Sequence, residues 1–142
     1  MKIYLSATSP VDQNKSHQWV SSLSALDSLV AKSEASSIIC ENFFSTLPLE
    51  QIQMAMNLII SKMRIGCNLV ITAPDITMLC QRMTKDEIDI GAINRILFKN
   101  GSIQSVCSTE VIEQLIPLNI EIFNKHFDIA TSNIMITARR SS

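Results

Sequence analysis

The sequence predicts an α/β fold whose sheet is mostly parallel and ends with an antiparallel strand pair. Short apolar runs at residues 38–44 and 69–72 are typical of strands buried in a sheet. The segment between them has apolar residues at helical spacing, so the middle of the chain forms a strand–helix–strand unit. Such a unit requires parallel strands and a right-handed crossover. Residues 120–123 and 134–137 alternate between apolar and polar, which predicts a terminal antiparallel pair.

The first thirty residues give a less definite pattern. Residues 3–5 form a short β-type opening that ends at a polar turn through Pro10, and residues 11–15 are polar and loop-like. Residues 17–30 fit two interpretations. Their apolar residues recur at helical spacing, which favours one amphipathic helix, but they also fit two short extended pieces separated by serines.

The central helix has clear start and stop signals. Thr46 and Pro48 are residues that begin helices, and Glu50 lies in the first turn, where a negative charge suits the helix dipole. Basic residues up to Arg64 occupy the expected last turn. Gly66 follows at the position where helices often end with a left-handed residue.

The last third of the chain predicts short helices before the terminal strands. Residues 76–83 and 88–98 have helical patterns, and Gly101 interrupts after the second. Ser108 is a suitable cap for a helix over residues 109–116. No internal repeat or linker divides the chain, so we expect a single domain over residues 1–142.

Composition narrows the function classes. Hydrophobic residues make up 46% of the chain and charged residues 18%, as in ordinary globular proteins. The net charge is −1, and the 12 basic and 13 acidic side chains are spread along the chain, which argues against nucleic-acid binding. No apolar run reaches membrane-spanning length, so no membrane partner is expected. With no signal peptide and with cysteines that read as reduced thiols, we expect a cytoplasmic protein, in a cell or an infected host.

Metal binding is not expected either. None of the four cysteines belongs to a C-x-x-C pair, and the two histidines lie far from them in the sequence. Zinc sites are normally marked by such close ligand pairs.

Two segments carry a resemblance to a known family. Residues 38–44 (IICENFF), followed by Leu47 and Pro48, resemble the fourth strand of class I S-adenosylmethionine-dependent methyltransferases and the turn after it. Residues 61–72 (SKMRIGCNLVIT) resemble that family's "K-L-R-x-G-G-x-L-V-I" passage into strand five. The chain is similar to small, phage-type methyltransferase-like proteins. The better-matched half covers about residues 36–140, and residues 1–35 form a divergent cofactor-side part.

The resemblance implies a compact Rossmann-like methyltransferase fold. In it, residues 3–5 are strand one and residues 18–22 are strand two, so we favour the strand interpretation there over the helix. In open α/β sheets, ligands bind outside the carboxyl ends of the strands. The candidate positions for S-adenosylmethionine follow strands one and four: Ser6, Ala7, Thr8, Ser9, Glu41 and Asn42.

Asp75 is the candidate on the substrate side. It follows the next buried strand, so the same positional argument applies to it. Because it comes directly after Pro74 and before an expected helix, it is also a natural helix cap, and we favour that role.

The cofactor side departs from the family pattern. The family places an acidic residue and glycines after strand one, but none of the three glycines here precedes Gly66. At the end of strand two, where the family has an acidic residue for the ribose, the chain has Ser21 and Ser22, and Cys67 replaces a glycine of the strand-five passage. Losing several contacts of about 1–3 kcal/mol each weakens cofactor binding by orders of magnitude.

These observations lead to two hypotheses. The first is a catalytically degenerate methyltransferase-fold protein that acts as a binding or assembly module, with a homo-oligomer or another protein as partner. The alternative is an active S-adenosylmethionine-dependent methyltransferase that acts on a small molecule or glycan. The alternative predicts a concave pocket bordered by residues 6–9, and it fails if Tyr4, Phe43 or Phe44 fills that space.

Overall fold

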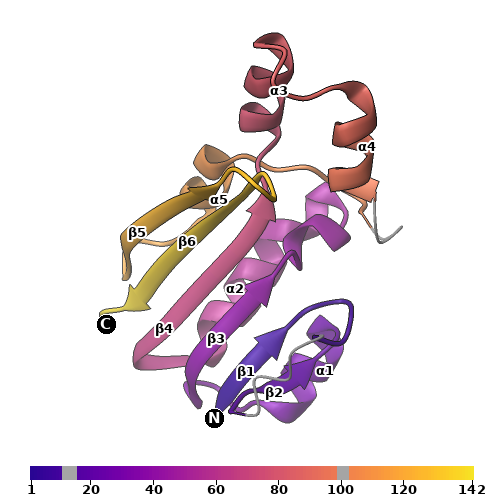
Figure 1. The fold of residues 1–142 in the computed structure, drawn as a ribbon. Coiled ribbons are helices and arrows are strands. Elements are labelled where there is room, and N and C mark those ends of the chain that lie inside the picture. Colours follow the sequence, from indigo (N-terminus) through magenta and orange to yellow (C-terminus); the bar gives the residue numbers. More distant parts are fainter. Residues whose placement is uncertain (11–15, 99–102) are drawn as a thin grey trace.

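The computed structural model describes residues 1–10, 16–98 and 103–142 (Figure 1). The loop expected over residues 11–15 and the interruption expected at Gly101 lie outside this part. The strands are β1 (Lys2–Leu5), β2 (Gln18–Val20), β3 (Ala35–Glu41), β4 (Met63–Pro74), β5 (Ile120–Asp128) and β6 (Asn133–Arg140). The helices are α1 (Leu23–Leu29), α2 (Ile52–Lys62), α3 (Ile76–Thr84), α4 (Ile90–Phe98) and α5 (Thr109–Leu115), with 3-10 turns at Phe44–Thr46 and Leu49–Gln51.

The six strands form one sheet in the order β2-β1-β3-β4-β6-β5. Strands β1 to β4 pair in parallel, whereas β6 is antiparallel to both of its neighbours, β4 and β5. The predicted α/β class, with a mostly parallel sheet and a C-terminal antiparallel pair, is therefore confirmed. Among the described residues, no helix combines the length and apolar character needed to cross a bilayer.

The ambiguous segment over residues 17–30 contains one strand and one helix. The strand predicted from the resemblance is present at Gln18–Val20, and the helical interpretation holds from residue 23 onward. The alternative of two extended pieces placed the second of them over residues 26–30, and that part was wrong because helix α1 continues to Leu29. The helix forms because the Ser22 hydroxyl caps it, accepting a hydrogen bond from the Ala25 N–H at 3.1 Å, which lets Leu26 turn into the core.

The central helix ends earlier than its sequence signals indicate. Helix α2 stops at Lys62, and β4 begins at the next residue, so Arg64 and Gly66 belong to the strand. The predicted C-terminal turn was wrong because the chain leaves the helix two residues sooner. Gly66 has φ +81°, and it lies where the pairing of β3 with β4 shifts register. Its left-handed backbone serves this irregular strand start instead of a helix end.

Strand β3 also ends earlier than expected. It stops at Glu41, and Asn42 has a left-handed φ of +48°. This turn directs Phe43 and Phe44 into the core, where their rings meet edge to face with centroids 6.3 Å apart. The apolar pair therefore anchors the connection to α2 and does not extend the strand.

The helices cover one face of the sheet. The connections from β2 to β3, β3 to β4 and β4 to β5 all run in the same direction across the sheet, so right-handed crossovers put α1, α2 and α5 on the same face. In Figure 1 this face is turned away from the viewer. Its strand residues, such as Ile3, Ile38, Leu69 and Ile136, are fully buried.

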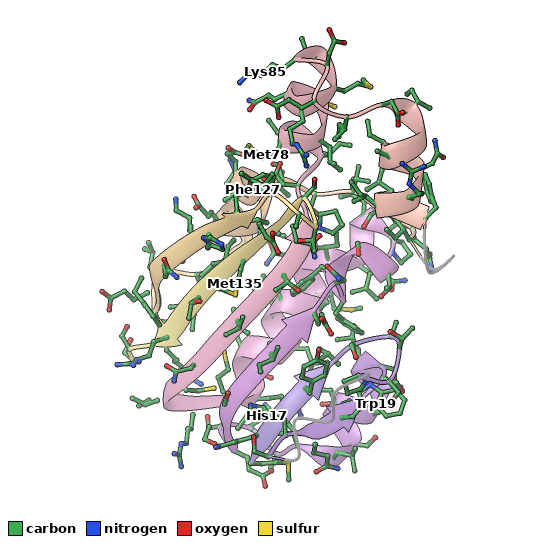
Figure 2. All side chains as sticks on the ribbon, in the orientation of Figure 1. His17, Trp19, Met78, Lys85, Phe127 and Met135 are labelled. Carbon is green, nitrogen blue, oxygen red and sulfur yellow. The ribbon has the colours of Figure 1, made fainter. Side chains whose placement is uncertain are left out.

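On the opposite face, no helix of the described residues covers the sheet, and we call it the open face. Among the crossovers between parallel strands, the connection from β1 to β2 alone runs the other way, and its described residues form no helix. Tyr4, Ile39, Val70 and Met135 lie on this face and are half-buried, in strict alternation with the buried residues beside them. Met135 is labelled in Figure 2. Parallel sheets are normally covered on both sides, whereas the described residues place helices over one side of this sheet.

Candidate functional site

The site lies at the carboxyl ends of the parallel strands. A hollow of about 1180 Å³ opens there, between the ends of β1, β3 and β4 and the arm formed by α3 and α4. Its wall includes residues 6–10 after β1, together with Tyr4, Glu41, Asn42 and Pro74 from the strands and their ends. The topology therefore brings the predicted positions Ser6, Ala7, Thr8, Ser9, Glu41 and Asn42 to one cavity.

The loop after β1 uses part of its backbone for its own structure. The Ser6 N–H donates to the Val20 carbonyl at 3.2 Å, and the Ser6 carbonyl accepts from the Trp19 indole N–H at 3.1 Å. The Ser6 hydroxyl, which is buried, donates to the Thr8 carbonyl at 2.7 Å. These bonds tie the loop to β2, and they leave the Ser6 N–H unavailable to a ligand.

Tyr4 and Glu41 both line the hollow and contact each other. The Tyr4 hydroxyl donates a hydrogen bond to Oε2 of Glu41, across the β1–β3 pair. Burial, this hydrogen bond and the neighbouring carboxylate all raise the pKa of Tyr4 above its usual range. The phenol therefore stays protonated and keeps Glu41 in place as an acceptor.

Asn42, which also lines the hollow, connects three segments through hydrogen bonds. Its backbone N–H donates to the Thr72 carbonyl at 2.9 Å, and its side-chain oxygen accepts from the Asn133 amide at 3.1 Å. The Ser45 hydroxyl donates to the Asn42 carbonyl at 2.9 Å. Asn42 thus fastens the end of β3 to β4 and β6, which explains why its left-handed backbone is held there.

The arm supplies the other wall. The apolar side chains of Ile88, Ala92 and Ile96 line it, together with the arginines Arg82 and Arg95. Beside Arg82, the β5–β6 turn and the start of β6 contribute Ala130, Thr131 and Asn133. The hollow therefore combines a hydroxyl-rich loop, one acidic group, and an apolar wall with two cationic groups.

Asp75 occupies the capping role that its position favours. Its Oδ1 accepts from the Met78 N–H at 3.0 Å, at the start of α3. Its Oδ2 accepts from the N–H of Thr109 at 3.0 Å and from the hydroxyl of the same residue at 2.5 Å, at the start of α5. The side chain is buried and is not among the described residues that line the hollow, so its carboxylate caps two helices at once.

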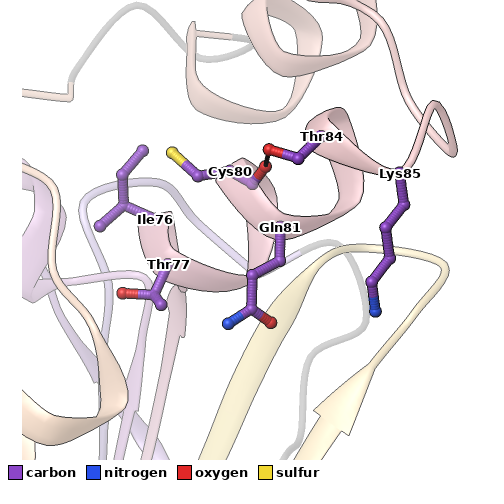
Figure 3. A pocket seen from close by; sticks show the side chains of 6 residues that line it. All are labelled: Ile76, Thr77, Cys80, Gln81, Thr84 and Lys85. Atoms are coloured by element: carbon purple, nitrogen blue, oxygen red, sulfur yellow. Dashed lines mark hydrogen bonds between the residues drawn. The ribbon is translucent and has the colours of Figure 1, made fainter.

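A second, shallower hollow of about 450 Å³ follows the outer side of α3 (Figure 3). Its lining residues are Ile76, Thr77, Cys80, Gln81, Thr84 and Lys85. Cys80 is exposed there, whereas the other three cysteines are free and buried. Among residues 1–10, 16–98 and 103–142, no group of three or more His, Cys, Asp and Glu side chains is placed to hold a metal ion.

Known proteins match this chain in fold. No sequence family matches it, and no curated protein is similar to it in sequence. A SAM-dependent methyltransferase from Archaeoglobus fulgidus aligns over 89% of this chain and 69% of its own, with a TM-score of 0.57 and 13% identity. The N-methyltransferase NodS from Bradyrhizobium japonicum, solved with S-adenosyl-l-homocysteine, aligns over 89% and 55%, with a TM-score of 0.56 and 11% identity. Magnesium protoporphyrin IX methyltransferase from Synechocystis, with the same ligand bound, aligns over 88% and 51%, with a TM-score of 0.57 and 12% identity.

The chain has the fold of SAM-dependent methyltransferases. Identities this low establish the architecture alone. The chain spans between about half and two thirds of the length of these three methyltransferases. The Rossmann-like methyltransferase architecture that the sequence resemblance implied is therefore confirmed.

Sequence reasoning found one side of the hollow and missed the other. The rule that ligands bind at strand ends identified Glu41, Asn42 and the loop after β1. It gave no signal for Arg82 or Arg95, because an arginine on a short helix is ordinarily a solvated side chain. Their shared wall follows from how the arm folds back over the strand ends, which no local pattern encodes.

Proposed function

We propose that this protein is a methyltransferase-fold binding and assembly module that does not use S-adenosylmethionine at physiological concentration. Its likeness to small phage-type methyltransferase-like proteins is part of this proposal. The observation that carries it is the loop after β1. The loop lacks glycine, and the Ser6 N–H and carbonyl are hydrogen-bonded to β2. The Ser6 hydroxyl is also engaged, because it donates to the Thr8 carbonyl. A cradle for the cofactor needs free backbone N–H groups close to the ligand.

Calorimetry tests the missing cradle directly. We expect titration with S-adenosylmethionine, and separately with S-adenosylhomocysteine, to give no saturable heat, which corresponds to a dissociation constant weaker than about 1 mM. The NodS and protoporphyrin methyltransferase structures hold S-adenosylhomocysteine, so a protein of that type serves as the positive control. A micromolar dissociation constant for either ligand would refute the proposal.

The assembly part of the proposal rests on the open face of the sheet. We propose that a second copy of the chain covers this face. Lys2 and Arg139 lie at one end of the face, with Glu121 beside Arg139, and Glu41 lies at the other end. A two-fold axis parallel to the plane of the sheet and perpendicular to the strands then places Lys2 of one copy over Glu41 of its partner. Ile39 and Val70 supply the apolar centre, and a net charge of −1 opposes association only weakly.

The hollow itself favours the second candidate function, an active methyltransferase on a small molecule or glycan. Phe43 and Phe44 are buried in the core, whereas Tyr4 lines the hollow without filling it, so the space at the strand ends is open, as that hypothesis requires. Methyl transfer depends mainly on alignment of the reacting atoms, so a differently built cradle is compatible with it. Release of S-adenosylhomocysteine during incubation with pooled small-molecule and glycan acceptors would decide for this candidate. No release, together with silent calorimetry, decides for the binding module.

A further inference from the structure

The charged groups of the large hollow differ in how they are occupied. Glu41 accepts the hydrogen bond from Tyr4. Arg82 donates through Nη1 to the Ile129 carbonyl at 3.0 Å and to the Ser132 hydroxyl, and its Nε lies 3.5 Å from the Glu87 carboxylate. Arg82 is therefore held by the β5–β6 turn and by its own helix end.

Arg95 is the exception. It lines the hollow from α4, and it forms no ion pair or hydrogen bond with any residue in the part of the chain that the structure describes. Its neighbours toward the cavity on the same helix, Ala92 and Ile96, are apolar. A guanidinium group with five free donors beside an apolar wall is suited to an anion attached to an apolar body.

The charges around the cavity are partly balanced. Among the described lining residues, the cationic groups are Arg82 and Arg95 and the acidic group is Glu41, which is engaged with Tyr4. Glu87 lies 3.5 Å from Arg82, and the Asp89 carboxylate and the exposed Arg95 guanidinium both lie beside Gly91. The unpaired donors of Arg95, and not the net charge of the walls, therefore favour an anion.

We propose that the hollow binds a small molecule with an apolar ring system and one anionic group, with the ring against α4 and the anion on Arg95. The proposal rests on the binding role proposed above, and it names the ligand class of that site. Carboxylate, sulfonate and phosphate groups share the chemistry that the guanidinium recognises. The hydroxyls of Thr8 and Ser9, which also line the hollow, are then available to polar groups of the ligand.

A matched pair of fluorescent probes tests the anion. 8-Anilinonaphthalene-1-sulfonate and N-phenyl-1-naphthylamine share an aromatic skeleton, but only the first carries a sulfonate. We expect the sulfonate probe to bind saturably and at least about tenfold more tightly than the neutral one. Arg95→Gln should remove about tenfold of that affinity and leave the neutral probe unchanged. Arg64→Gln, at an exposed position in the first part of β4, is the control and should change neither.

A further variant places the probes in this cavity. Ile96→Ser should weaken both probes, because it removes apolar surface from the wall of α4. The inference is overturned if the two probes bind equally, if Arg95→Gln behaves like Arg64→Gln, or if Ile96→Ser leaves both affinities unchanged. These outcomes are independent of the cofactor titration. Tight S-adenosylmethionine binding refutes the proposed function, while the response to Arg95→Gln still decides the ligand class.

Discussion

The two faces of the sheet are formed by the same strands but differ in how helices cover them. On the helix-covered face, Ile38 is fully buried in the core, whereas Ile39 on the open face is half-buried and has no helix of the described residues over it. Among the crossovers between parallel strands, the connection from β1 to β2 alone runs against the direction of the others, and its described residues form no helix. The same connection contains the glycine-free residues 6–10 that line the hollow. The exposed face and the proposed loss of the cofactor cradle therefore belong to one connection.

The comparison predicts very different costs for neighbouring truncations. Ile38→Ala should lower the free energy of unfolding by about 2–5 kcal/mol, because it leaves a cavity in the packed core. Ile39→Ala should cost about 1 kcal/mol or less when the chain is monomeric. Urea unfolding at low protein concentration measures both. If Ile38→Ala fails to fold, Ile38→Val should still cost about 0.5–1.5 kcal/mol. Equal losses at the two positions would mean that the open face is covered within the monomer.

Thiol reactivity separates the core from the surface. Cys40 and Cys67 are buried, and burial raises the pKa of Cys67 to about 11 and that of Cys40 further still. At pH about 8, iodoacetamide should modify the exposed Cys80 roughly 100-fold faster than either of them. Peptide mass spectrometry over a time course measures the rates, and the same labelling in urea provides the unfolded control. Rapid native labelling of Cys40 would show that the covered face opens.

Self-association should depend on the open face. Ile39→Lys places an unpaired charge at its centre and should weaken the dimer by more than about tenfold. Ile65→Lys, at an exposed apolar position away from that centre, is the matched control and should leave association unchanged. Sedimentation velocity over a concentration series measures both. A wild-type chain that stays monomeric throughout would refute the two-fold assembly.

The smallest expected effect concerns His17, which lies beside the open face with Nε2 3.2 Å from the Ser37 hydroxyl (Figure 2). Partial burial and then the charge of Lys2 lower the pKa of His17. The unfolded chain, with a pKa of about 6.5, therefore binds this proton more readily than the folded chain does. The resulting stability is complete above about pH 6.5 and is lost as the pH falls through the folded pKa.

Urea midpoints at several pH values between about 5 and 8 test this effect. The wild type should lose slightly more stability toward the acidic end than His17→Gln does. An identical pH profile for the two proteins would show that His17 titrates alike in the folded and unfolded chains.

The elements predicted correctly from the sequence were those long enough to show a periodic pattern of apolar residues. The β3–α2–β4 unit was predicted because its strands and helix are long enough to show their periods, and Asp75 because a residue after proline and before a helix is a recognisable cap. Strand β2 has three residues, too few to show alternation, so residues 17–30 stayed ambiguous. Gly66 misled because a left-handed glycine serves a helix end and a strand irregularity equally well.

The site was predictable only where it follows from sheet topology. Parallel strands end at one edge, so Glu41 and the loop from Ser6 to Ser9 were expected to meet there, and the structure brings them to one hollow. The hydrogen bond from Tyr4 to Glu41 depends on strand register, which the sequence does not specify. The placement of Arg95 depends on the tertiary path of the arm.

The double cap at Asp75 has a consequence for how this architecture diversifies. One carboxylate holds the start of α3 and the start of α5, and the Ile76 N–H donates to the Cys107 carbonyl at 3.0 Å, so the excursion over residues 76–108 leaves and rejoins the body at nearly the same point. A segment with coincident ends is a natural place for exchange, because replacing it need not disturb the strands on either side. An engineered chain should therefore tolerate a replacement of this lobe, and with it of the residues facing the cavity, while Asp75 keeps the junction closed.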